Sequence, residues 1–406
     1  MQRFVIIGAG HAGAQLCASL RKEGFAGEIV LIGDEGVVPY QRPPLSKGYL
    51  KGEVERARLW IRPESFYADE RIDLRLDDPV IEIDRDRAEV VLRSGARFGY
   101  DRLALATGAH VRTLELPGHE LEGVVTIRTL ADIDAMRTSW DQAARVVVIG
   151  AGFIGLEAAA VAAAHDKQVV VLEKAPRALA RVVEPKVSEV MTALHRAHGV
   201  DLRFDVDVSG FVGEHGRLTG ISLGDGQVVL CELAVVGIGV IPASELAEAA
   251  GLACDNGVVV DACCRTSDPA IFAAGDVTRF PSPFSAAPVR LESVQNAVDQ
   301  AKACALAMLD RPQDYVDVPW FWSDQYDVKL QIVGLGEGAD TAVWRAGPKE
   351  HSGSLWSYTA GRLTRVDAIA MPQAYVLGKR WIEKGQSPNP DAVADPASVL
   401  KEAPLV

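Results

Sequence analysis

A glycine-rich turn that occurs twice constrains the fold of this chain more than any other feature. The segment Val5-Ile6-Ile7-Gly8-Ala9-Gly10-His11-Ala12-Gly13 recurs as Val147-Val148-Ile149-Gly150-Ala151-Gly152-Phe153-Ile154-Gly155. In each copy an apolar strand pattern precedes the glycines and a helix pattern follows them. Since a repeat of this kind is one supersecondary motif used twice, we predict two strand–turn–helix motifs.

The spacing of the glycines in the first copy predicts a dinucleotide site. Gly8 permits a tight turn, Gly10 lets the backbone approach a pyrophosphate, and Gly13 lets the helix pack closely on the strand. The N–H groups and dipole at the helix N-terminus then favour the anion. A second strand pattern ends at Asp34 and Glu35, where a carboxylate can accept from ribose hydroxyls.

The second copy repeats this context and ends its second strand pattern at Glu173. A carboxylate there accepts from a free 2'-hydroxyl and repels a 2'-phosphate, so it favours NAD over NADP. Lys174 and Arg177 lie nearby and leave accommodation of a 2'-phosphate open. Two dinucleotide sites suit hydride transfer, with a permanent flavin in one site and an exchanging nicotinamide in the other.

Composition and targeting signals exclude several classes of function. The formal net charge of -13 argues against a protein that coats nucleic acid or an anionic membrane surface. No apolar run reaches the roughly 18 residues of a membrane span. The chain starts with a strand pattern and not with a signal-like segment, so we expect a cytoplasmic location.

The cysteines and histidines give no metal or dithiol pattern. None of the six cysteines forms a C-x-x-C pair, and we expect no structural disulfides. The adjacent Cys263 and Cys264 are expected on a strand, where neighbouring side chains point to opposite faces. His195 and His198 are interpreted as surface residues of a helix, and we predict no metal site.

Four further segments carry a resemblance to a known family, which covers essentially the whole chain. It resembles the oxygenase-coupled, NADH-dependent ferredoxin reductases, the family of putidaredoxin reductase and biphenyl dioxygenase reductase, within the flavoprotein group of glutathione reductase. The segments are Arg42-Pro43-Pro44-Leu45-Ser46-Lys47, Leu103-Ala104-Leu105-Ala106-Thr107-Gly108, Thr266-Ser267-Asp268-Pro269-Ala270-Ile271-Phe272-Ala273-Ala274-Gly275-Asp276 and Trp320-Phe321-Trp322-Ser323-Asp324-Gln325-Tyr326. Because it is so dense in rare residue types, the last segment is the most diagnostic.

The resemblance assigns roles to individual residues. Lys47 would lie beside the flavin and pair with Glu157, which we place in the first turn of the second-copy helix. Phe153, where many relatives have tyrosine, would shield the flavin until nicotinamide displaces it. Trp322 would contact the flavin and serve electron exit, and Asp276 would bind the ribityl chain, with a helix N-cap as its structural alternative.

The resemblance also implies two sets of cofactor contacts. The FAD contacts are Gly8, Gly10, His11, Ala12, Gly13, Asp34, Glu35, Arg42, Pro43, Lys47, Val80, Ala106, Thr107, Gly108, Arg128, Gly275, Asp276, Glu292, Ser293, Val294 and Trp322. The NAD contacts are Gly150, Gly152, Phe153, Ile154, Gly155, Glu157, Glu173, Gly237, Ile238 and Gly239.

We therefore predict an α/β fold with two Rossmann-like dinucleotide-binding domains of the glutathione reductase type and a small α+β C-terminal domain. The FAD-binding domain is split between residues 1–114 and 242–319. The NAD-binding domain covers 115–241, and the C-terminal cap or interface domain covers 320–406, with a helix near 374–384 and a loosely packed final stretch.

The predicted activity is that of a ferredoxin–NAD(+) reductase that uses FAD and NADH. Electrons would pass to a 2Fe-2S ferredoxin that serves a haem monooxygenase or a Rieske dioxygenase. A basic patch on the reductase, with Arg311, Lys329, Arg345, Lys379 and Arg380 as its candidates, would dock the ferredoxin. The oligomeric state, monomer or dimer, is left open.

Three other activities are alternatives to this prediction. Disulfide reductases and peroxidases carry a redox cysteine where this chain has Pro43-Pro44-Leu45-Ser46-Lys47, which contains no thiol. A redox signalling flavoprotein of the apoptosis-inducing-factor type shares the Arg42–Lys47 segment, but such proteins usually also contain a targeting sequence and insertions. The third alternative is an NADH oxidase without a catalytic thiol.

Overall fold

The computed structural model describes residues 1–406, which form two compact units. Unit 1 consists of residues 1–41, 56–110 and 241–320, and unit 2 of residues 42–55, 111–240 and 321–406. Two of the three predicted domains are defined by the cofactor that each one binds, so the domain bounds stay a prediction. One segment that they assign to the FAD-binding domain, residues 42–55, belongs to unit 2.

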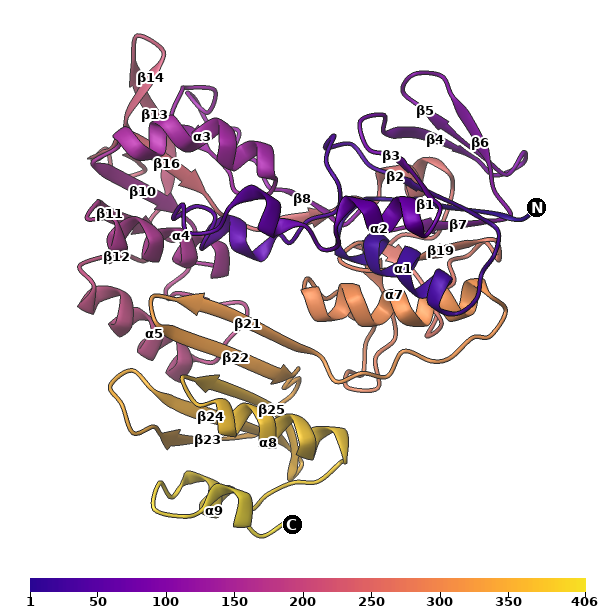
Figure 1. The fold of residues 1–406 in the computed structure, drawn as a ribbon. Helices are drawn as coiled ribbons and strands as arrows, with labels where there is room; N and C mark the ends of the chain where they lie inside the picture. Colours follow the sequence, from indigo (N-terminus) through magenta and orange to yellow (C-terminus); the bar gives the residue numbers. More distant parts are fainter. The chain divides into compact units, whose positions relative to one another are not determined.

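Unit 1 is built on a five-stranded parallel sheet with the strand order β19-β7-β1-β2-β3. The strands are β1 (Arg3–Ile7), β2 (Glu28–Ile32), β3 (Ile72–Arg75), β7 (Arg102–Leu105) and β19 (Ile271–Ala273). Helices α1 (His11–Lys22) and α7 (Val294–Met308) pack side by side, as Figure 1 shows. Phe4 and Ile6 belong to the hydrophobic core that these helices share, and Val5 and Ile7 to the core of the opposite face. A sheet buried on both faces explains the continuous apolar strands.

Unit 2 contains a second five-stranded parallel sheet with the equivalent order, β12-β11-β10-β16-β9. Its strands are β9 (Val124–Val125), β10 (Arg145–Ile149), β11 (Gln168–Leu172), β12 (Asp201–Arg203) and β16 (Leu233–Val236). Its helices are α3 (Leu130–Gln142), α4 (Phe153–Ala164) and α5 (Pro185–Ala197). Ile149 lies opposite Leu172 and Val236, as Ile7 lies opposite Ile32 and Leu105. The two predicted strand–turn–helix motifs are thus confirmed.

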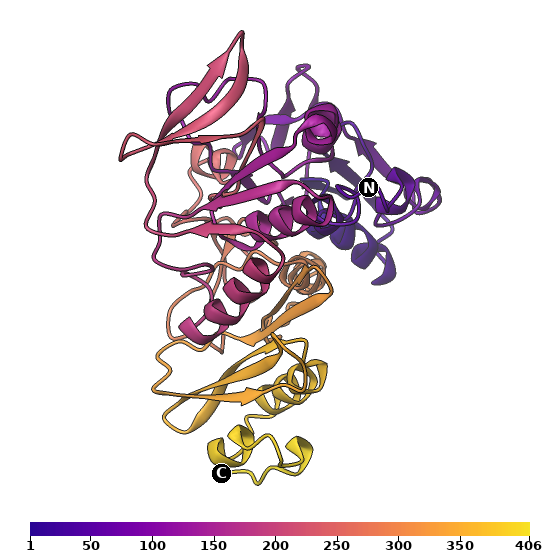
Figure 2. The ribbon, with the colours of Figure 1, turned by 90° about the vertical axis from the view of Figure 1, so that its left-hand side faces the viewer.

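The duplication extends beyond the glycine turns. A three-stranded antiparallel sheet, β4 (Val80–Asp84), β5 (Glu89–Leu92) and β6 (Arg97–Gly99), is inserted between β3 and β7. In unit 2 the sheet of β13 (Val208–Glu214), β14 (Arg217–Leu223) and β15 (Val228–Leu230) stands at the same point, between β12 and β16. Figure 2 shows the β13–β14 hairpin projecting from the parallel strands of unit 2. The repeated element is therefore a strand–helix–strand motif with its own antiparallel insertion.

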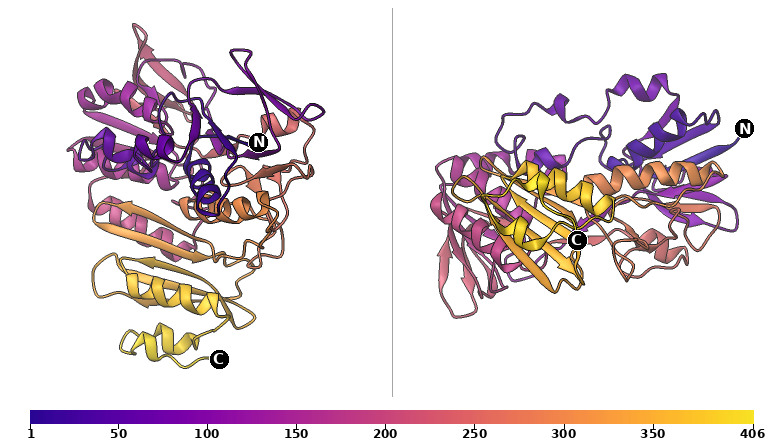
Figure 3. Two further views of the ribbon diagram at one scale, coloured as in Figure 1. Left: turned by 45° about the vertical axis from the view of Figure 1, so that its right-hand side comes forward. Right: turned by 90° about the horizontal axis from the view of Figure 1, so that it is seen from below.

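The C-terminal residues form an antiparallel sheet with the strand order β21-β22-β25-β24-β23. Its strands are β21 (Trp320–Gln325), β22 (Val328–Gly334), β23 (Thr341–Ala346), β24 (Gly353–Thr359) and β25 (Arg362–Ile369). Helix α8 (Pro372–Glu383) packs on β22 and β25, and Figure 3 shows it along one face of the sheet. The predicted α+β character is confirmed.

The final stretch is anchored through helix α9 (Pro390–Ala394) to the C-terminal sheet, so the prediction of a loosely packed tail is wrong for this part, while Leu405 and Val406 at its end are exposed. It also contains the 3-10 turn η3 (Leu400–Glu402), and Val393 and Leu400 are buried. Arg345, only 7% exposed, donates to the carbonyl oxygens of Val393, Asp395, Pro396 and Ser398 and to the Ser398 hydroxyl. A guanidinium committed to these bonds is not available for docking, and Arg345 drops out of the predicted basic patch.

Short elements complete the chain. They are the 3-10 turns η1 (Pro43–Ser46) and η2 (Arg56–Leu59), helices α2 (Glu64–Asp69) and α6 (Glu245–Ala249), the paired strands β8 (Ala109–Val111) and β17 (Val240–Pro242), and the pair β18 (Val258–Val259) and β20 (Thr278–Arg279). None of the helices has the length and apolarity that crossing a bilayer requires.

The six cysteines are free thiols. Cys264 has a φ of 69° and lies in a turn, so the expected strand at Cys263 and Cys264 is wrong. Burial raises the pKa of the Cys17 thiol to about 12, and the pKa of the Cys263 thiol to about 11. Raised pKa values of this kind suppress the thiolate form that redox chemistry needs.

Candidate functional site: two dinucleotide turns and a buried carboxylate

Two of the three glycines in the first turn are required by the packing of unit 1 itself. Gly8 has a φ of +110°, and a Cβ there would lie 2.1 Å from the carbonyl oxygen of Ala106. A Cβ at Gly13 would lie 2.0 Å from the carbonyl oxygen of Gly8. Side chains are thus excluded at both positions, as the predicted turn and the close helix packing demand.

Gly10 has a different reason to be glycine. Its φ of -91° is open to any residue, and a Cβ there would meet no atom within 4 Å. Neither the backbone conformation nor the packing of the protein requires glycine at this position. The open space in front of helix α1 leaves room for a pyrophosphate, as the predicted dinucleotide turn requires.

The second turn reproduces this division. A Cβ at Gly150 would lie 2.5 Å from the carbonyl oxygen of Gly237, and one at Gly155 would lie 2.1 Å from that of Gly150. Gly152, with a φ of -77°, would meet only the Gly237 oxygen, at an ordinary 3.9 Å. The predicted site residue Gly237 therefore closes the second turn, just as Ala106 closes the first.

Both helices that follow the turns begin without a side-chain cap and without an acidic residue in the first turn. Such an N-terminus combines unsatisfied N–H groups with a positive dipole end, which suits a phosphate. The residues of both turns thus fit a dinucleotide. Since α4 begins at Phe153, Glu157 lies beyond its first turn, and the predicted place of Glu157 in the first turn is wrong.

The carboxylates after the second strands are held differently. In unit 2 the two oxygens of Glu173 accept from the backbone N–H groups of Ala151 (2.6 Å) and Ala175 (2.8 Å). In unit 1 the position equivalent to Glu173 is Gly33, where a Cβ would lie 2.8 Å from that of Ala9. The carboxylates of unit 1 therefore follow later, with Asp34 exposed and Glu35 accepting from the hydroxyl of Tyr40.

The turn that follows β19 in unit 1 contacts the start of α1. A Cβ at Gly275 would lie 3.0 Å from that of Ala12, so Gly275 and the neighbouring Asp276 lie beside the first glycine turn. The N–H of Gly275 donates to the buried amide oxygen of Gln300 on α7 (2.7 Å). Asp276 lies between β19 and β20 and caps no helix, so its structural alternative is wrong. Gln300 was not predicted, although a buried glutamine in a helix is a sign of such a bond.

Other predicted FAD contacts of unit 1 have structural partners. Thr107 donates to the carbonyl oxygen of Ala243, and Gly108 accepts from the N–H of the same residue. Val80 lies in the hydrophobic core of unit 1. Ser293 caps α7 by accepting from the N–H of Asn296, with Glu292 before it and Val294 as the first helical residue.

Glu157 is the centre of the site in unit 2. It is 2% exposed, and its Oε2 accepts from the Lys47 ammonium (2.7 Å) and the Ser46 hydroxyl (2.6 Å). Its Oε1 accepts from the hydroxyl of Ser323 (2.6 Å). Burial raises the pKa of the Glu157 carboxyl, while Lys47 and the two hydroxyls oppose that shift. The predicted Lys47–Glu157 pair is thus present, and Ser46 and Ser323 are partners that the sequence analysis missed.

Glu157 and its three donors lie on three segments of unit 2 that are far apart in the sequence. The buried carboxylate therefore joins these segments. Ser46 and Lys47 end the Arg42–Lys47 segment, Glu157 lies on α4, and Ser323 lies on β21. The same segment is tied to the chain near α3, where Arg42 donates to the carbonyl oxygen of Arg128 (2.9 Å). The Arg42–Lys47 segment and the segment on β21, which both carry the family resemblance, therefore meet at the side chain of Glu157.

Aromatic residues surround the start of α4. The ring of Phe153 lies against that of Phe321, with centroids 4.5 Å apart, and Phe321 lies 6.5 Å from the ring of Trp322. Ile154, the next residue of the turn, is 42% exposed. A large apolar side chain exposed beside a dinucleotide turn is available to a ligand.

His195 is buried, so its interpretation as a surface residue is wrong. The imidazole Nε2 lies 2.7 Å from Oε1 of Gln325, and Nδ1 lies 3.1 Å from the hydroxyl of Tyr326. Burial lowers the pKa of His195 to about 4. The exposed His198 stacks on the Tyr326 ring at 3.7 Å. Both histidines thus attach α5 to the end of β21.

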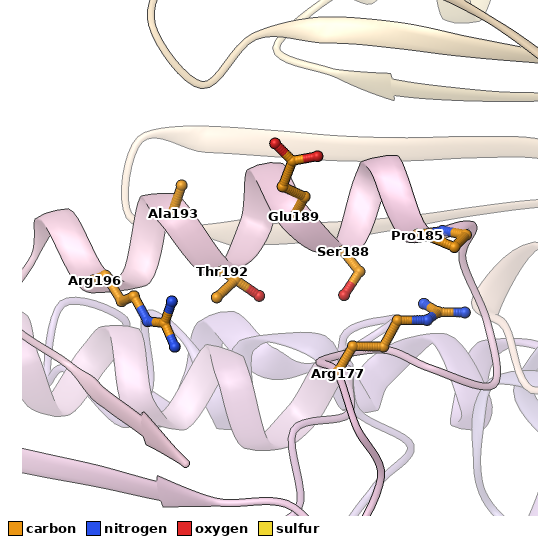
Figure 4. Close-up of a pocket in the computed structure, with 7 residues that line it drawn as sticks. All are labelled: Arg177, Pro185, Ser188, Glu189, Thr192, Ala193 and Arg196. Carbon is orange, nitrogen blue, oxygen red and sulfur yellow. The ribbon is translucent and has the colours of Figure 1, made fainter. Parts of the chain in front are cut away.

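A pocket of about 470 Å³ lies along α5 in unit 2. Figure 4 shows its seven lining residues, with Ser188 and Thr192 pointing toward the side of α5 where Arg177 lies. Arg177 donates to the carbonyl oxygens of Val183 and Ala180, and Ser188 donates to that of Ala178. Several polar groups of the pocket are thus already paired, and Arg177 is the one lining residue that the sequence places near a dinucleotide site.

Comparison with known proteins agrees with this geometry. Residues 2–301 match the family described as pyridine nucleotide-disulphide oxidoreductase, and residues 320–404 match the reductase C-terminal family. The fold and its two glycine turns thus define the class, an oxidoreductase that binds FAD and NAD(P)H.

The similar proteins narrow this class. The chain is 42% identical over 400 residues to rhodocoxin reductase of Rhodococcus erythropolis, which covers 98% of this chain and 94% of the relative. Among solved structures it is similar to the ferredoxin reductase for the CYP199A2 system of Rhodopseudomonas palustris, with a TM-score of 0.95, 43% identity and 99% of each chain covered. The covalent putidaredoxin reductase–putidaredoxin complex gives a TM-score of 0.95 at 38% identity, over 99% of this chain and 97% of the other. The chain belongs to the pyridine nucleotide-disulphide oxidoreductases and, among them, to the ferredoxin reductases of oxygenase systems.

Proposed function

We propose that the protein takes a hydride from NADH onto FAD and passes the electrons singly to a 2Fe-2S ferredoxin that serves a haem monooxygenase or a Rieske dioxygenase. The observation that carries the proposal is the buried Glu157, which joins two segments typical of ferredoxin reductases, Arg42–Lys47 and β21. Bound flavin supplies the conversion of one two-electron donor into two one-electron steps.

The preference for NADH is supported by the residues around Glu173. Its carboxylate is fixed by two backbone N–H groups, and the remaining lone pairs can accept from a free 2'-hydroxyl. Of the two nearby cations, Arg177 donates to backbone carbonyl oxygens, whereas Lys174 forms only an exposed pair with Asp207. A 2'-phosphate would therefore meet the Glu173 carboxylate with Arg177 already engaged.

The roles of the site residues belong to this proposal. Lys47 and Glu157 polarise and orient the reacting groups, because hydride transfer needs no general acid or base from the protein. A lysine ammonium beside the flavin would stabilise the negative charge that two-electron reduction produces. Phe153 shields the flavin until nicotinamide arrives, and Trp322 serves electron exit. The predicted FAD and NAD contacts complete the two sites.

The rivals lack support from the contacts of the chain. A disulfide reductase would need a thiol in the Arg42–Lys47 segment, where Ser46 and Lys47 instead bind Glu157. The redox signalling flavoprotein and the thiol-free NADH oxidase differ from the proposal in the electron acceptor. A cytoplasmic location goes with the proposal, because NADH is an intracellular donor.

A direct assay separates these activities. The FAD-loaded protein would be mixed with NADH, cytochrome c and each of a panel of 2Fe-2S ferredoxins, with a rubredoxin and buffer as controls. We expect cytochrome c reduction that depends on one of the ferredoxins. Rapid reduction of the bound flavin by NADH, together with no ferredoxin-dependent reduction of cytochrome c, would argue for the oxidase or signalling alternatives.

A further inference from the structure

A line of hydrogen bonds connects helix α5 to Glu157. The imidazole of His195 bonds to Oε1 of Gln325 (2.7 Å), and Nε2 of Gln325 donates to the hydroxyl of Ser323 (3.1 Å). The Ser323 hydroxyl in turn donates to Oε1 of Glu157 (2.6 Å). All four side chains are 2% exposed or less. Buried polar groups held in one network have little freedom to adopt other orientations.

The direction of these bonds is set by the carboxylate. In its ion pair with the Lys47 ammonium the Glu157 carboxylate can only accept, so Ser323 donates to it and accepts from Gln325. The amide oxygen of Gln325 is then turned toward His195, which must present an N–H at Nε2. The opposite tautomer of His195 would reverse the amide and leave Oε1 of Glu157 without the hydroxyl proton of Ser323. The tautomer of His195 and the orientation of the Ser323 donor to Glu157 are thus coupled.

The line cannot serve as a path for protons. The amide of Gln325 interrupts it, because an amide neither takes up nor releases a proton near neutral pH. His195 is also neutral there, since burial and the neighbouring His198 lower its pKa to about 4. What the line can transmit is orientation.

We propose that His195 is a positioning residue for Lys47: through Gln325 and Ser323 it fixes the Glu157 carboxylate that holds the Lys47 ammonium. The inference rests on the proposed function, in which Lys47 acts on the flavin. It assigns a part in that function to a helix of unit 2 that contributes no residue to the predicted FAD and NAD contacts.

The test uses the FAD-loaded protein and four substitutions. His195→Leu removes both ring nitrogens, whereas His195→Gln offers an amide N–H in the place of Nε2. His198→Leu is the matched control, because His198 directly follows α5 and stacks on Tyr326, while its Nδ1 lies against the carbonyl oxygen of Leu194 and not against Gln325. Lys47→Met removes the group through which His195 is proposed to act. FAD content and thermal unfolding would show that each variant is folded.

Two readouts distinguish positioning from a general structural role. One is the rate of flavin reduction by NADH in a stopped-flow experiment, and the other is the midpoint potential of the bound flavin. We expect His195→Leu to slow flavin reduction by roughly 3- to 10-fold when it is the only substitution. In the Lys47→Met background the same substitution should slow flavin reduction by less than about 2-fold, since the effects of coupled sites are not additive. The midpoint potential should fall in His195→Leu as in Lys47→Met, because both weaken the cation near the reduced flavin. His195→Gln should restore most of the rate, and His198→Leu should keep it.

The outcomes separate the two proposals. If Lys47→Met changed neither the rate nor the midpoint potential, the role of Lys47 in the proposed function would be wrong. If Lys47→Met changed both but His195→Leu changed neither, or slowed the reaction equally in both backgrounds, the inference about His195 would be overturned alone.

Discussion

The two glycine turns of this chain share one architecture, but the helices that follow them differ in the contacts that their side chains make. In both, the first and third glycines are enforced by the backbone, and the middle one faces open space. Two residues after the last glycine, however, the first copy has Gln15 and the second has Glu157. Gln15 donates to Ser19 on the same helix (3.0 Å), whereas the partners of Glu157 lie more than 100 residues away in the sequence.

This difference teaches how one duplicated motif supports two tasks. The turn itself meets the needs of a pyrophosphate, so its glycines are the same in both copies. The second copy adds a buried carboxylate that ties the Arg42–Lys47 segment and strand β21 to its helix. Binding is therefore common to the two copies, while the groups proposed to act on the flavin are attached to the second copy alone.

The largest expected effect comes from filling the open space at each middle glycine. Gly10→Val should yield folded protein without FAD, because the added side chain occupies the space for the pyrophosphate and not that of a protein atom. Gly152→Val should keep FAD and weaken NADH binding by about 3 kcal/mol or more, roughly 100-fold. Flavin absorbance of the purified variants and NADH titration would measure this. Loss of FAD in Gly152→Val but not in Gly10→Val would reverse the assignment of the two turns.

The second effect concerns the dependence of stability on pH. Hydrogen bonds connect Glu157 of the second copy to His195, the one buried histidine of the chain. Its pKa falls from 6.5 to about 4 on folding, so the unfolded chain takes up the proton first as the pH drops. The stability from the neutral imidazole is complete above pH 6.5 and is lost between pH 6.5 and 4, by about 3 kcal/mol. His195→Gln should show a free energy of unfolding that falls less over this range, as urea denaturation at pH 7, 6 and 5 would show. Equal pH dependence of the two proteins would contradict the account.

The third effect tests the carboxylate that distinguishes the copies. Glu157→Gln removes the charge that holds Lys47 and should slow flavin reduction by NADH by roughly 10- to 100-fold. Gln15→Ala, at the equivalent position of the first copy, should change the rate by less than about 2-fold, because Gln15 bonds locally to Ser19 on its own helix. Stopped-flow absorbance would measure both variants, and similar losses in the two would remove the proposed division of tasks.

The smallest effect concerns coenzyme choice. Glu173→Ala removes the carboxylate that disfavours a 2'-phosphate and should reduce the preference for NADH over NADPH by roughly 10-fold, about 1.4 kcal/mol. Asp34→Ala in the first copy should leave that preference unchanged. Steady-state kcat/KM for both coenzymes would decide, and an unchanged ratio in Glu173→Ala would assign the discrimination to other residues.

Much of this arrangement follows from local patterns in the sequence. Glycine spacing predicted both turns, because the constraints at Gly8 and Gly13 act within one strand–turn–helix motif. The positions of Ser46 and Ser323 around Glu157 depend on contacts between segments more than 100 residues apart, which no local pattern contains. The Lys47–Glu157 pair could be expected only through the family resemblance.

Three missed or misinterpreted residues did leave a signal in the sequence. His195 follows Val187, Met191 and Leu194 at helical spacing, which places it on the buried stripe of α5. Ser323 and Gln325 alternate on one strand and share its buried face, where polar side chains need partners. Both patterns indicate buried hydrogen bonds, but the partners become known only from the fold.

The most direct test of the central claim is the number of ferredoxin molecules reduced for each NADH consumed. Under anaerobic conditions the FAD-loaded protein would receive a limiting amount of NADH and an excess of the 2Fe-2S ferredoxin found in the panel assay. We predict about two reduced ferredoxins per NADH, since a hydride carries two electrons and each cluster accepts one. NADH oxidation that requires oxygen and leaves the ferredoxin oxidised would contradict the account.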